Sequence, residues 1–513
     1  MLQFKKIKAF YFAAITVIVG MVVSAESVMA QNYPAKETYR PQYHFSPKAH
    51  WMNDPNGMVY LNGKYHLFFQ YNPGGTTWGP MHWGHAISTD LLHWKEQPIA
   101  LYPDSLGMIF SGSAVVDVNN TAGFGENTLV AIYTYHNQKI EDAKTGLHQY
   151  QGIAYSKDEG KTWKKYEGNP VLPNPGIWDF RDPKVSWNEE SKQWVMTLAT
   201  KQSVTFYSSK DLKSWKRLSE FGNDLGAHGG VWECPDLFSL VYNGVKKWVL
   251  LVSINPGGPN GGSATQYFIG NFDGKTFTPE NIATRWIDYG ADNYAGVTFS
   301  GTGDRRIFMG WMNNWQYANQ VPTLNWRGAN TLPRELKLIQ TGNTLSLASM
   351  PVKEISKIVQ SPVFFKNLQG KQSYDLSATI KPLHSRYVLD LTTSNMVSFA
   401  IRLHNREGDE LIAGYEKETN TIYVDRRKAG KVDFEKSFAR KALAPRVSAS
   451  KQFSLKLYVD AASVELFADQ GLTVQTNVVF PKAPLDQLYI EARQILNIKQ
   501  LKISGISNTV NQR

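Results

Sequence analysis

The sequence predicts an all-β protein in which a five-bladed β-propeller is followed by a C-terminal β-sandwich. Helical periodicity is nearly absent beyond the N-terminal segment, and short apolar runs alternate with Gly, Asn and Asp turns. One hairpin pattern recurs five times along the first two thirds of the chain. The pattern then changes near residues 345–358, and plain alternating strands follow. Sheet units repeated at a regular spacing are typical of a propeller.

The N-terminal segment has the composition of a signal peptide. Basic residues at 5–8 precede an apolar stretch over about residues 9–23, and small residues follow. The tripeptide at 28–30 fits a small-x-small cleavage site, so we expect residues 1–30 to be removed and the protein to be secreted or periplasmic. Cleavage after residues 23–25 is a second option, and a retained membrane anchor is the alternative, although the apolar run is short for a spanning helix.

The five repeated hairpins each join an apolar strand to a second, strongly apolar strand. In the first copy, residues 58–61 lead through the turn Asn62-Gly63 to residues 65–71. The second strands of the other four copies lie at 128–135, 193–199, 247–254 and 306–312. We therefore place the propeller at residues 38–345.

A second repeated signature is an Asp turn followed four or five residues later by an aromatic ring. Such a turn is typical of a hairpin at the outside of a propeller blade. The three clear copies are Asp90 with Trp94, Asp158 with Trp163 and Asp211 with Trp215, and Asp273 with Phe277 is a weaker one.

The C-terminal third lacks both signatures. Alternating strands such as 387–392, 397–403 and 453–459 favour a separate β-sandwich. We expect a linker at residues 346–360 and the sandwich at residues 361–513.

Charge and cysteine content exclude some classes of protein. The formal net charge is +11, but Lys and Arg are scattered and no nucleic-acid recognition motif accompanies them. We therefore expect no nucleic-acid partner. The single cysteine, Cys234, rules out an internal disulfide, so the stability of an exported chain must come from core burial.

Four acidic residues occupy the same place in the repeat, just before an inner hairpin. They are Asp54, Asp182, Glu233 and Asp292. Because the innermost strands of a propeller begin at one mouth of the central channel, we expect these carboxylates to converge on one funnel. A nucleophile and a proton donor for glycoside hydrolysis would explain them. Hard-cation binding and simple turn capping are the alternatives.

Three motifs around these acids resemble the signature boxes of glycoside hydrolase family 32. They are Trp51-Met52-Asn53-Asp54-Pro55-Asn56-Gly57, Phe180-Arg181-Asp182-Pro183-Lys184 and Trp232-Glu233-Cys234-Pro235-Asp236-Leu237-Phe238. The family contains invertases, inulinases, levanases and fructan exohydrolases, and it combines a five-bladed propeller with a β-sandwich. The resemblance runs from about Tyr43 to the C-terminus. The segment 323–328 departs from many relatives just before Trp-Arg-Gly, and a different leaving-group preference could follow.

The resemblance implies a role for each acid. Asp54 is the expected nucleophile, and Glu233 is the expected general acid and base, which must hold a proton near the working pH. Asp182 is the expected stabiliser of the positively charged transition state. Arg181 is expected to keep Asp182 ionised, unless it forms only a surface ion pair.

Further residues match positions that line the fructose pocket in the family. For the two tryptophans of the set, sheet packing is the alternative. The expected substrate-binding residues are Asn53, Gln70, Trp78, Phe110, Ser111, Arg181, Asp292 and Trp315. We expect no cofactor and no metal, because His82 and His85 have no third ligand attached to them by a motif.

The predicted function is a retaining hydrolase that releases fructose from β-D-fructofuranosides, acting from the chain end on levan or inulin, with sucrose as a further candidate substrate. The expected partner is therefore an oligo- or polysaccharide, with no membrane span after signal cleavage and the oligomeric state left open. An invertase or a transfructosylase is the alternative with the same chemistry. A non-catalytic carbohydrate-binding propeller would require one of the three acids to be replaced, and all three are present.

Overall fold

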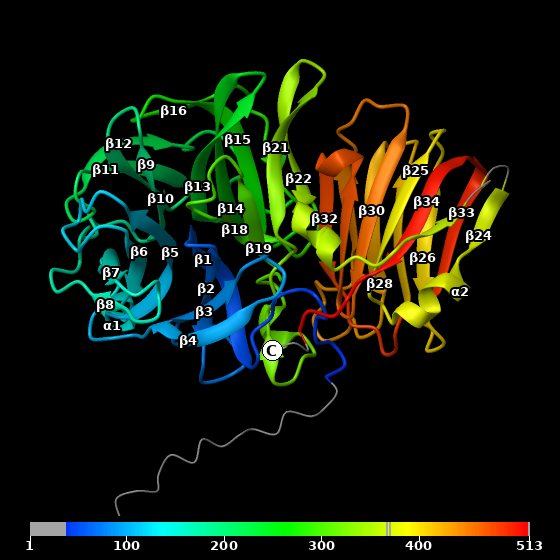
Figure 1. Ribbon diagram of the computed structural model, residues 1–513, viewed down its shortest axis with the longest axis horizontal. Helices are drawn as coiled ribbons and strands as arrows, with labels where there is room; N and C mark the ends of the chain where they lie inside the picture. The colour runs from blue at the N-terminus through cyan, green and yellow to red at the C-terminus, as the bar shows by residue number, and fades with distance from the viewer. Residues whose placement is uncertain (1–36, 366–367, 369–370, 511–513) are drawn as a thin grey trace, which may run out of the picture. The chain divides into compact units, whose positions relative to one another are not determined.

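Strands dominate the computed structural model, which describes residues 37–365, 368 and 371–510. The predicted signal peptide therefore lies outside the described residues. Five sheets of four or five strands cover residues 50–351, and two six-stranded sheets follow (Figure 1). This arrangement confirms the predicted fold class, a five-bladed propeller followed by a sandwich. In the part that the structure describes, no helix is long and apolar enough to cross a membrane.

The five blades follow one another along the chain. Blade I contains β1 (His50–Leu61), β2 (Lys64–Asn72), β3 (His82–Ser88), β4 (Lys95–Leu101) and β20 (Trp326–Arg327). Blade II contains β5 (Met108–Asp117), β6 (Thr128–His136), β7 (Gln149–Ser156) and β8 (Lys164–Lys165), with the short helix α1 (Gln138–Asp142) between β6 and β7. Blade III contains β9 (Phe180–Asn188), β10 (Gln193–Thr200), β11 (Ser203–Ser209) and β12 (Lys216–Phe221). Blade IV contains β13 (Val231–Tyr242), β14 (Val245–Asn255), β15 (Ala264–Phe272), β16 (Phe277–Pro279) and β17 (Arg285–Trp286). Blade V contains β18 (Tyr294–Thr298), β19 (Ile307–Trp311), β21 (Arg334–Thr341) and β22 (Thr344–Pro351).

Both repeated signatures of the sequence correspond to defined parts of a blade. The five hairpins are the first two strands of blades I to V, and all are antiparallel. The Asp turns join the third strand to the fourth. In blade III, for example, Asp211 accepts hydrogen bonds from the backbone N–H of Lys213 (2.9 Å) and Ser214 (2.8 Å), and the Trp215 indole donates to the Leu212 carbonyl. The prediction that these turns form outer hairpins is confirmed.

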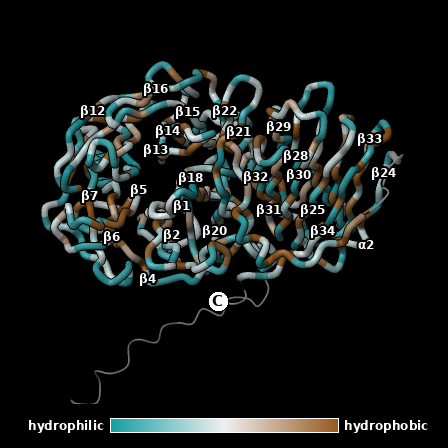
Figure 2. The backbone as a smooth tube through the Cα atoms, turned by 45° about the horizontal axis from the view of Figure 1, so that its top comes forward, coloured by the Kyte–Doolittle hydropathy of each residue, from teal (hydrophilic) through white to brown (hydrophobic). Residues whose placement is uncertain are grey.

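Apolar side chains fill the spaces between neighbouring blades and so hold the ring together. Val59 and Phe68 of blade I pack with Ile109 and Tyr133 of blade II in one buried cluster. Figure 2 shows hydrophobic residues along the strands and hydrophilic residues in many of the connecting loops. The ring is completed by a parallel pairing of β20 with β1, in which His50 faces Trp326. Burial of this apolar surface positions the inner ends of five strands around one channel.

The C-terminal unit is a sandwich of two six-stranded sheets. One sheet contains β23 (Val363–Phe365), β25 (Tyr387–Thr393), β30 (Phe453–Asp460), β31 (Ser463–Ala468), β32 (Thr473–Val478) and β34 (Ile498–Gly505). The other contains β24 (Lys371–Asp375), β26 (Phe399–His404), β27 (Glu410–Glu416), β28 (Thr421–Lys428), β29 (Lys441–Pro445) and β33 (Gln487–Leu496), and α2 (Ser377–Ile380) lies between β24 and β25 in the chain. A single large apolar cluster lies between the two sheets, as expected for face-to-face packing.

The start of the linker differs from the prediction. β22 pairs with β21 as far as Pro351, so the first residues predicted as linker belong to blade V. A short 3-10 helix at Lys353–Lys357 and an extended stretch then lead to β23. The strand continues because Leu347 and Ala348 are buried against the blade, a tertiary contact that the change of pattern near residue 345 does not reveal.

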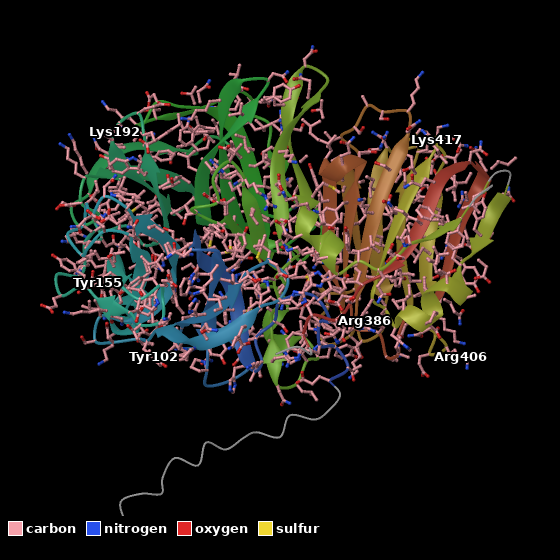
Figure 3. All side chains as sticks on the ribbon, viewed as in Figure 1. Tyr102, Tyr155, Lys192, Arg386, Arg406 and Lys417 are labelled. Atoms are coloured by element: carbon pink, nitrogen blue, oxygen red, sulfur yellow. The ribbon has the colours of Figure 1, made fainter. Side chains whose placement is uncertain are left out.

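Basic side chains are spread over both units. Figure 3 shows Lys192 on the outside of the propeller and Lys417 and Arg406 at separate places on the sandwich. Several surface lysines are paired with nearby acids, such as Lys192 with Glu189 (2.8 Å) and Lys246 with Glu190 (2.9 Å). The labelled basic residues therefore lie at separate places on both units.

Candidate active site

A bulge interrupts the inner strand of every blade at its mouth end. In each blade, two residues of the first strand oppose one residue of the second strand. Three of the bulged residues have left-handed backbone, Asp182 (φ 64°), Cys234 (φ 46°) and Ala295 (φ 52°). Bulges redirect side chains and are common beside active sites. The bulged pairs are Asn53-Asp54, Phe110-Ser111, Asp182-Pro183, Cys234-Pro235 and Ala295-Gly296.

Asp54 is held by donors on both carboxylate oxygens. The Asn53 amide donates to Oδ1 (2.9 Å), and the Ser111 hydroxyl donates to Oδ2 (2.8 Å). Asn53 is in turn oriented by the indole N–H of Trp51, which donates to its Oδ1 (2.7 Å). These contacts fix the direction of the carboxylate, and Asp54 remains partly exposed to the funnel.

Cys234 connects Asp54 to Asp182. Its backbone N–H donates to Asp182 Oδ2 (3.0 Å), and its thiol lies 3.6 Å from the same oxygen and 3.5 Å from Asp54 Oδ2. Burial and the neighbouring carboxylates raise the pKa of the Cys234 thiol well above its usual value. Cys234 therefore acts as a small, buried, neutral donor between two acids.

Glu233 receives hydrogen bonds from two different side chains. The Arg181 guanidinium donates to Oε1 from Nη2 (3.1 Å) and Nε (3.2 Å), and the Tyr294 hydroxyl donates to Oε2. Arg181 also pairs with Asp179 (2.6 Å). The hydrogen-bonded partners of Arg181 are Glu233, Asp179 and Gln149 (3.4 Å). Its charge nevertheless lowers the pKa of Asp182, in the direction expected for a residue that keeps Asp182 ionised.

Burial and mutual repulsion raise the proton affinity of this cluster. Burial, followed by repulsion from Glu233, raises the pKa of Asp54. Burial raises the pKa of Asp182 to about 7; Arg181 opposes the shift, and the charges of Glu233 and Asp54 add to it. Asp54 and Asp182 therefore keep their protons to a higher pH than isolated aspartates do.

The predicted sugar contacts occupy several positions around these acids. Asn53 and Ser111 contact Asp54 directly. Gln70 lies opposite the bulge of β1, and its amide nitrogen has no hydrogen-bond partner among the described residues. Trp315 is partly buried, with its ring 5.8 Å from Trp51, so packing accounts for part of its surface. Trp78 is 39% exposed and meets Phe110 edge-on at 6.2 Å, so its ring remains available.

Asp292 does not join the cluster. It is fully buried, and its carboxylate accepts hydrogen bonds from Arg426 of the sandwich (2.5 Å), the backbone N–H of Val478 (2.8 Å) and the Tyr317 hydroxyl. Since both oxygens are occupied, the prediction that Asp292 contacts the sugar is wrong for this structure. The physical reason is that Asp292 precedes β18 on the side facing the sandwich, where it neutralises a buried arginine.

Tyr294 and Asp179 are site residues that the sequence reasoning missed. Tyr294 directly precedes the bulge of blade V as Glu233 precedes the bulge of blade IV, so the repeat could have indicated it. Asp179 carries no motif signal, and its contact with Arg181 appears only in the fold.

The described residues contain no group of three His, Cys, Asp or Glu side chains arranged to hold a metal ion. His85 instead bonds to His66 (3.1 Å), and His82 bonds to the Pro80 carbonyl (2.9 Å). The arrangement of acids is suited to proton transfer and to nucleophilic attack by a carboxylate.

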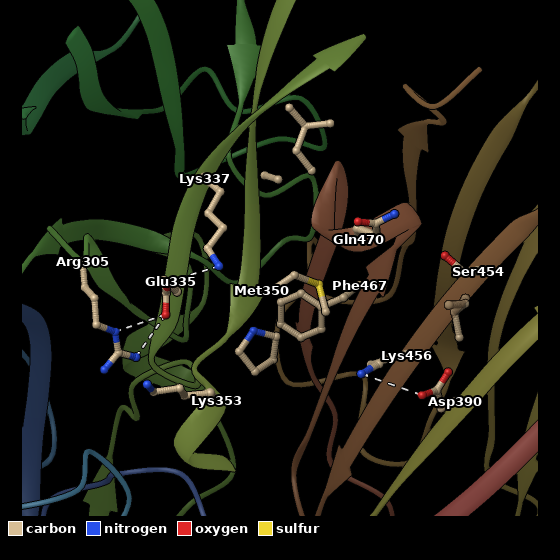
Figure 4. Close-up of a pocket in the computed structure, with 14 residues that line it drawn as sticks. Arg305, Glu335, Lys337, Met350, Lys353, Asp390, Ser454, Lys456, Phe467 and Gln470 are labelled. Atoms are coloured by element: carbon tan, nitrogen blue, oxygen red, sulfur yellow. Dashed lines mark hydrogen bonds and ion pairs between the residues drawn. The ribbon is translucent and has the colours of Figure 1, made fainter. Parts of the chain in front are cut away.

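A separate cavity of about 660 Å³ lies away from these acids, between β21 and β22 on one side and β25 and β30 on the other (Figure 4). Its walls carry ion pairs, among them Arg305 with Glu335 (3.1 Å) and Lys456 with Asp390 (3.7 Å). None of the predicted site residues lines it. We therefore place the candidate active site at the propeller mouth and not in this cavity.

Sequence and structure comparisons identify similar proteins. The model for "Glycosyl hydrolases family 32 N-terminal domain" matches residues 44–351, and "Glycosyl hydrolases family 32 C terminal" matches residues 349–504. The chain is 46% identical over 490 residues to a levanase of Bacillus subtilis, covering 91% of this chain and 70% of that protein. It is 42% identical over 502 residues to an extracellular exo-inulinase of Aspergillus niger, covering 90% of this chain and 93% of the relative. Among solved structures, the exo-inulinase of Aspergillus awamori has a TM-score of 0.84 at 38% identity and covers 93% of this chain and all of its own.

Proposed function

Because this chain belongs to glycosyl hydrolase family 32, we propose that it is a retaining hydrolase that releases fructose from the ends of levan or inulin chains. The observation that supports the retaining mechanism is the cluster of acids at the propeller mouth. There the backbone N–H of Cys234 donates to Asp182 and its thiol donates to Asp54. Arg181 and Tyr294 donate to Glu233. Retaining hydrolysis needs such a pair of carboxyl groups with different roles.

In the first step, Asp54 acts as the nucleophile. Its carboxylate forms a bond to the anomeric carbon of the terminal fructose, and the glycosidic bond breaks. Glu233 gives its proton to the departing glycosidic oxygen, so the rest of the chain leaves as an alcohol. Asn53 and Ser111 keep the attacking carboxylate in one orientation, which lowers the entropy cost of the attack.

In the second step, water releases the fructose. Glu233, now ionised, takes a proton from a water molecule, the hydroxide bonds to the anomeric carbon, and the ester to Asp54 breaks. Esterification removes the charge of Asp54, so its repulsion of Glu233 disappears when Glu233 must act as a base. Two inversions at one carbon leave the configuration unchanged.

Asp182 is the proposed stabiliser of the transition state. The sugar ring gains positive charge as the glycosidic bond breaks, and this charge favours the ionised form of a carboxyl group whose pKa is raised to about 7 by burial. An interaction that strengthens only as the transition state forms raises the rate and not merely the affinity.

The names of the relatives support the substrate class. The levanase and the exo-inulinase are both named for fructans, and each aligns with at least 90% of this chain. Another solved relative at 32% identity is a β-fructofuranosidase complexed with fructosyl-erythritol. The exo-inulinase is named as extracellular, which supports export of this chain.

The test is product analysis on levan, inulin and sucrose with the purified protein. Release of fructose alone from the two fructans supports attack at the chain end. A ladder of oligosaccharides at early times would contradict it, and growth of longer sugars from sucrose would instead identify a transfructosylase.

The nucleophile assignment is tested with Asp54→Asn. The amide cannot form the ester, so we expect kcat on inulin to fall by a factor on the order of 10⁴ or more with an unchanged circular dichroism spectrum. Asp390→Asn is the matched control, because Asp390 pairs with lysines on the sandwich. Near-normal activity of Asp54→Asn would refute the assignment.

A further inference from the structure

A continuous row of rings runs across three blades at the funnel mouth, and we call it the aromatic arc. Its members are Trp78, Phe110, His136, His148 and Trp178. Trp78 meets Phe110 edge-on (6.2 Å between centroids), and Phe110 stacks on His136 (4.3 Å, 9° between planes). His136 meets His148 edge-on (5.3 Å), and His148 packs on Trp178 at 4.6 Å. Each ring thus supports the next, from blade I to the loop before blade III.

The two ends of the aromatic arc lie beside different catalytic groups. Near one end, Phe110 precedes Ser111, whose hydroxyl bonds to Asp54 (2.8 Å). At the other end, Trp178 precedes Asp179, which pairs with Arg181 (2.6 Å). Arg181 in turn bonds to Glu233 (3.1 Å). The aromatic arc therefore passes from the side of the proposed nucleophile to the side of the proposed acid.

The exposed rings are the two ends. Trp78 and Trp178 are each 39% exposed, whereas His136 (5%) and His148 (1%) are buried. An exposed indole supported from below presents a flat apolar face with a polar N–H, which suits the mixed apolar and hydroxyl surface of a sugar ring.

The support beneath Trp178 is built from two hydrogen-bonded imidazoles. His136 bonds to Glu141 of α1 (3.1 Å) and to the Gln149 amide (3.3 Å), and His148 lies 3.8 Å from the other oxygen of Glu141. Burial lowers the pKa of both imidazoles, with Glu141 opposing the shift, so the rings are mainly neutral near pH 7.

The loop that carries Trp178 is also fixed. The Asn174 side chain accepts hydrogen bonds from the backbone N–H of Gly176 and Ile177 (2.8 Å each) and donates to the Ile177 carbonyl (2.9 Å). A pre-formed platform costs little entropy when a ligand binds to it.

We infer that Trp178 is the platform for fructosyl units on the leaving-group side of the cleaved bond, beyond the first unit. The inference rests on the proposed function. The leaving oxygen must lie beside Glu233 to receive its proton, so the leaving chain begins on this side. Trp178 is separated from Glu233 by Arg181 and Asp179, so the first leaving unit does not reach it and the next units do. Sucrose, whose leaving group is a single glucose, makes no use of this platform.

The test compares a fructan with sucrose in the full-length enzyme. For Trp178→Ala we expect kcat/KM on inulin or levan to fall about five- to tenfold, mainly through KM, as the loss of one aromatic contact implies. We expect kcat/KM on sucrose to change less than twofold. Trp178→Phe retains a flat ring and should recover most of the activity on fructan.

The control is Phe364→Ala on the sandwich, which removes a side chain that is 61% exposed and distant in sequence from the propeller mouth. It should leave kcat/KM on both substrates unchanged. If Trp178→Ala lowered kcat/KM equally on sucrose and fructan, or lowered it on neither, the inference would be overturned. The proposed function fails separately, if the unmodified enzyme releases no fructose from levan, inulin or sucrose.

Discussion

At the scale of single residues, the two donors to Glu233 have different consequences. Arg181 carries a full charge and is tied to Asp179, so it positions Oε1 from outside the funnel. Tyr294 is fully buried and donates to Oε2 from blade V. Together the two donors hold the carboxyl group of Glu233 in one orientation.

Removing the Tyr294 hydroxyl tests this arrangement. In Tyr294→Phe the carboxyl group of Glu233 loses one of the two side chains that orient it. We expect kcat on fructan to fall about tenfold because the carboxyl group is less well held. The measurement is the initial rate of fructose release at saturating fructan. Tyr415→Phe, which removes a hydroxyl bonded to Asn420 in the sandwich, should leave kcat unchanged.

Asp182 imposes a cost in stability that depends on pH. Burial raises its pKa in the folded protein to about 7, above the ordinary value of 3.8. Between these values the folded state binds a proton that the unfolded state has released, so stability falls as pH rises through this window. Asp182→Asn removes the ionisable group and with it this loss of stability. We expect its Tm to exceed that of the unmodified protein by about 2 °C or more at pH 8, and by less at pH 4, while activity is lost.

A control of opposite sign is available at Asp104. Burial opposes ionisation there, but the hydrogen bond from Lys165 and other donors lower the pKa of Asp104 overall. Asp104→Asn should therefore lower Tm at pH 8. If Asp182→Asn also lowered Tm at pH 8, the buried Asp182 carboxylate would not destabilise the folded protein, and the explanation would be wrong.

At the scale of elements, the bulge in each inner strand is what places the proposed catalytic groups. Regular alternation would point successive residues to opposite faces of a blade. In blade I, for example, Asn53 and Asp54 together face Gln70, so two adjacent side chains serve the same site. The left-handed backbone at Asp182, Cys234 and Ala295 is the local cost of this arrangement.

Ala295 allows this cost to be tested without touching a catalytic group. It is buried beside Tyr294 with φ 52°, a region that β-branched residues avoid. We expect Ala295→Val to lower the free energy of unfolding by about 2 kcal/mol and to reduce kcat by displacing Tyr294. Ala295→Gly, which adopts this backbone freely, should be close to neutral in both. Urea denaturation and initial rates provide the measurements, and equal behaviour of the two variants would contradict the backbone explanation.

At the scale of the whole molecule, buried charges join the propeller to the sandwich. Arg334 of blade V pairs with Asp288 (2.9 Å) and with Glu465 of β31, and none of the three is exposed by more than 1%. His44 links Asp460 (2.7 Å) and the same Glu465 (2.8 Å). Removing one partner would leave an uncompensated charge, so the two units should unfold together.

His44 makes this junction sensitive to alkaline pH. Burial alone would lower its pKa, but hydrogen bonds to Asp460 and Glu465 outweigh burial and raise the pKa to about 9, from an ordinary value of 6.5. A raised pKa in the folded state means that the stabilisation is complete below about pH 6.5 and is lost as pH rises to about 9. We expect the Tm of the unmodified protein to fall across this window.

The matching variant is His44→Gln. It should lower the free energy of unfolding by about 3 kcal/mol at pH 6, with a smaller loss at pH 9.5, where His44 is already neutral. Thermal denaturation at both values provides the measurement. His404→Gln, at a partly exposed histidine near Glu410 (3.6 Å), is the control and should show no such dependence. A loss from His44→Gln that was equal at both pH values would refute the charged junction.

Much of this protein follows from local sequence features. Asn62-Gly63 and Asn243-Gly244 specify their own turns, and Asp90, Asp158 and Asp211 cap theirs, because turn chemistry involves residues within a few positions of one another. Counting the repeated hairpins was therefore enough to predict five blades and to bring Asp54, Asp182 and Glu233 to one mouth.

Other features were decided only by the tertiary structure. Asp292 precedes its inner hairpin as the proposed catalytic acids precede theirs, but it lies outside β18, and Arg426, 134 residues away, holds it in the junction with the sandwich. Tyr294 bonds to Glu233 across 61 residues, and Trp178 lies on His148 with no motif to mark it. Hydrogen bonds and ring contacts between distant segments depend on how blades and sheets pack, and periodicity carries no information on that packing. The sequence by itself determined the fold and the three acids, whereas the packing of distant segments decided which neighbours tune them.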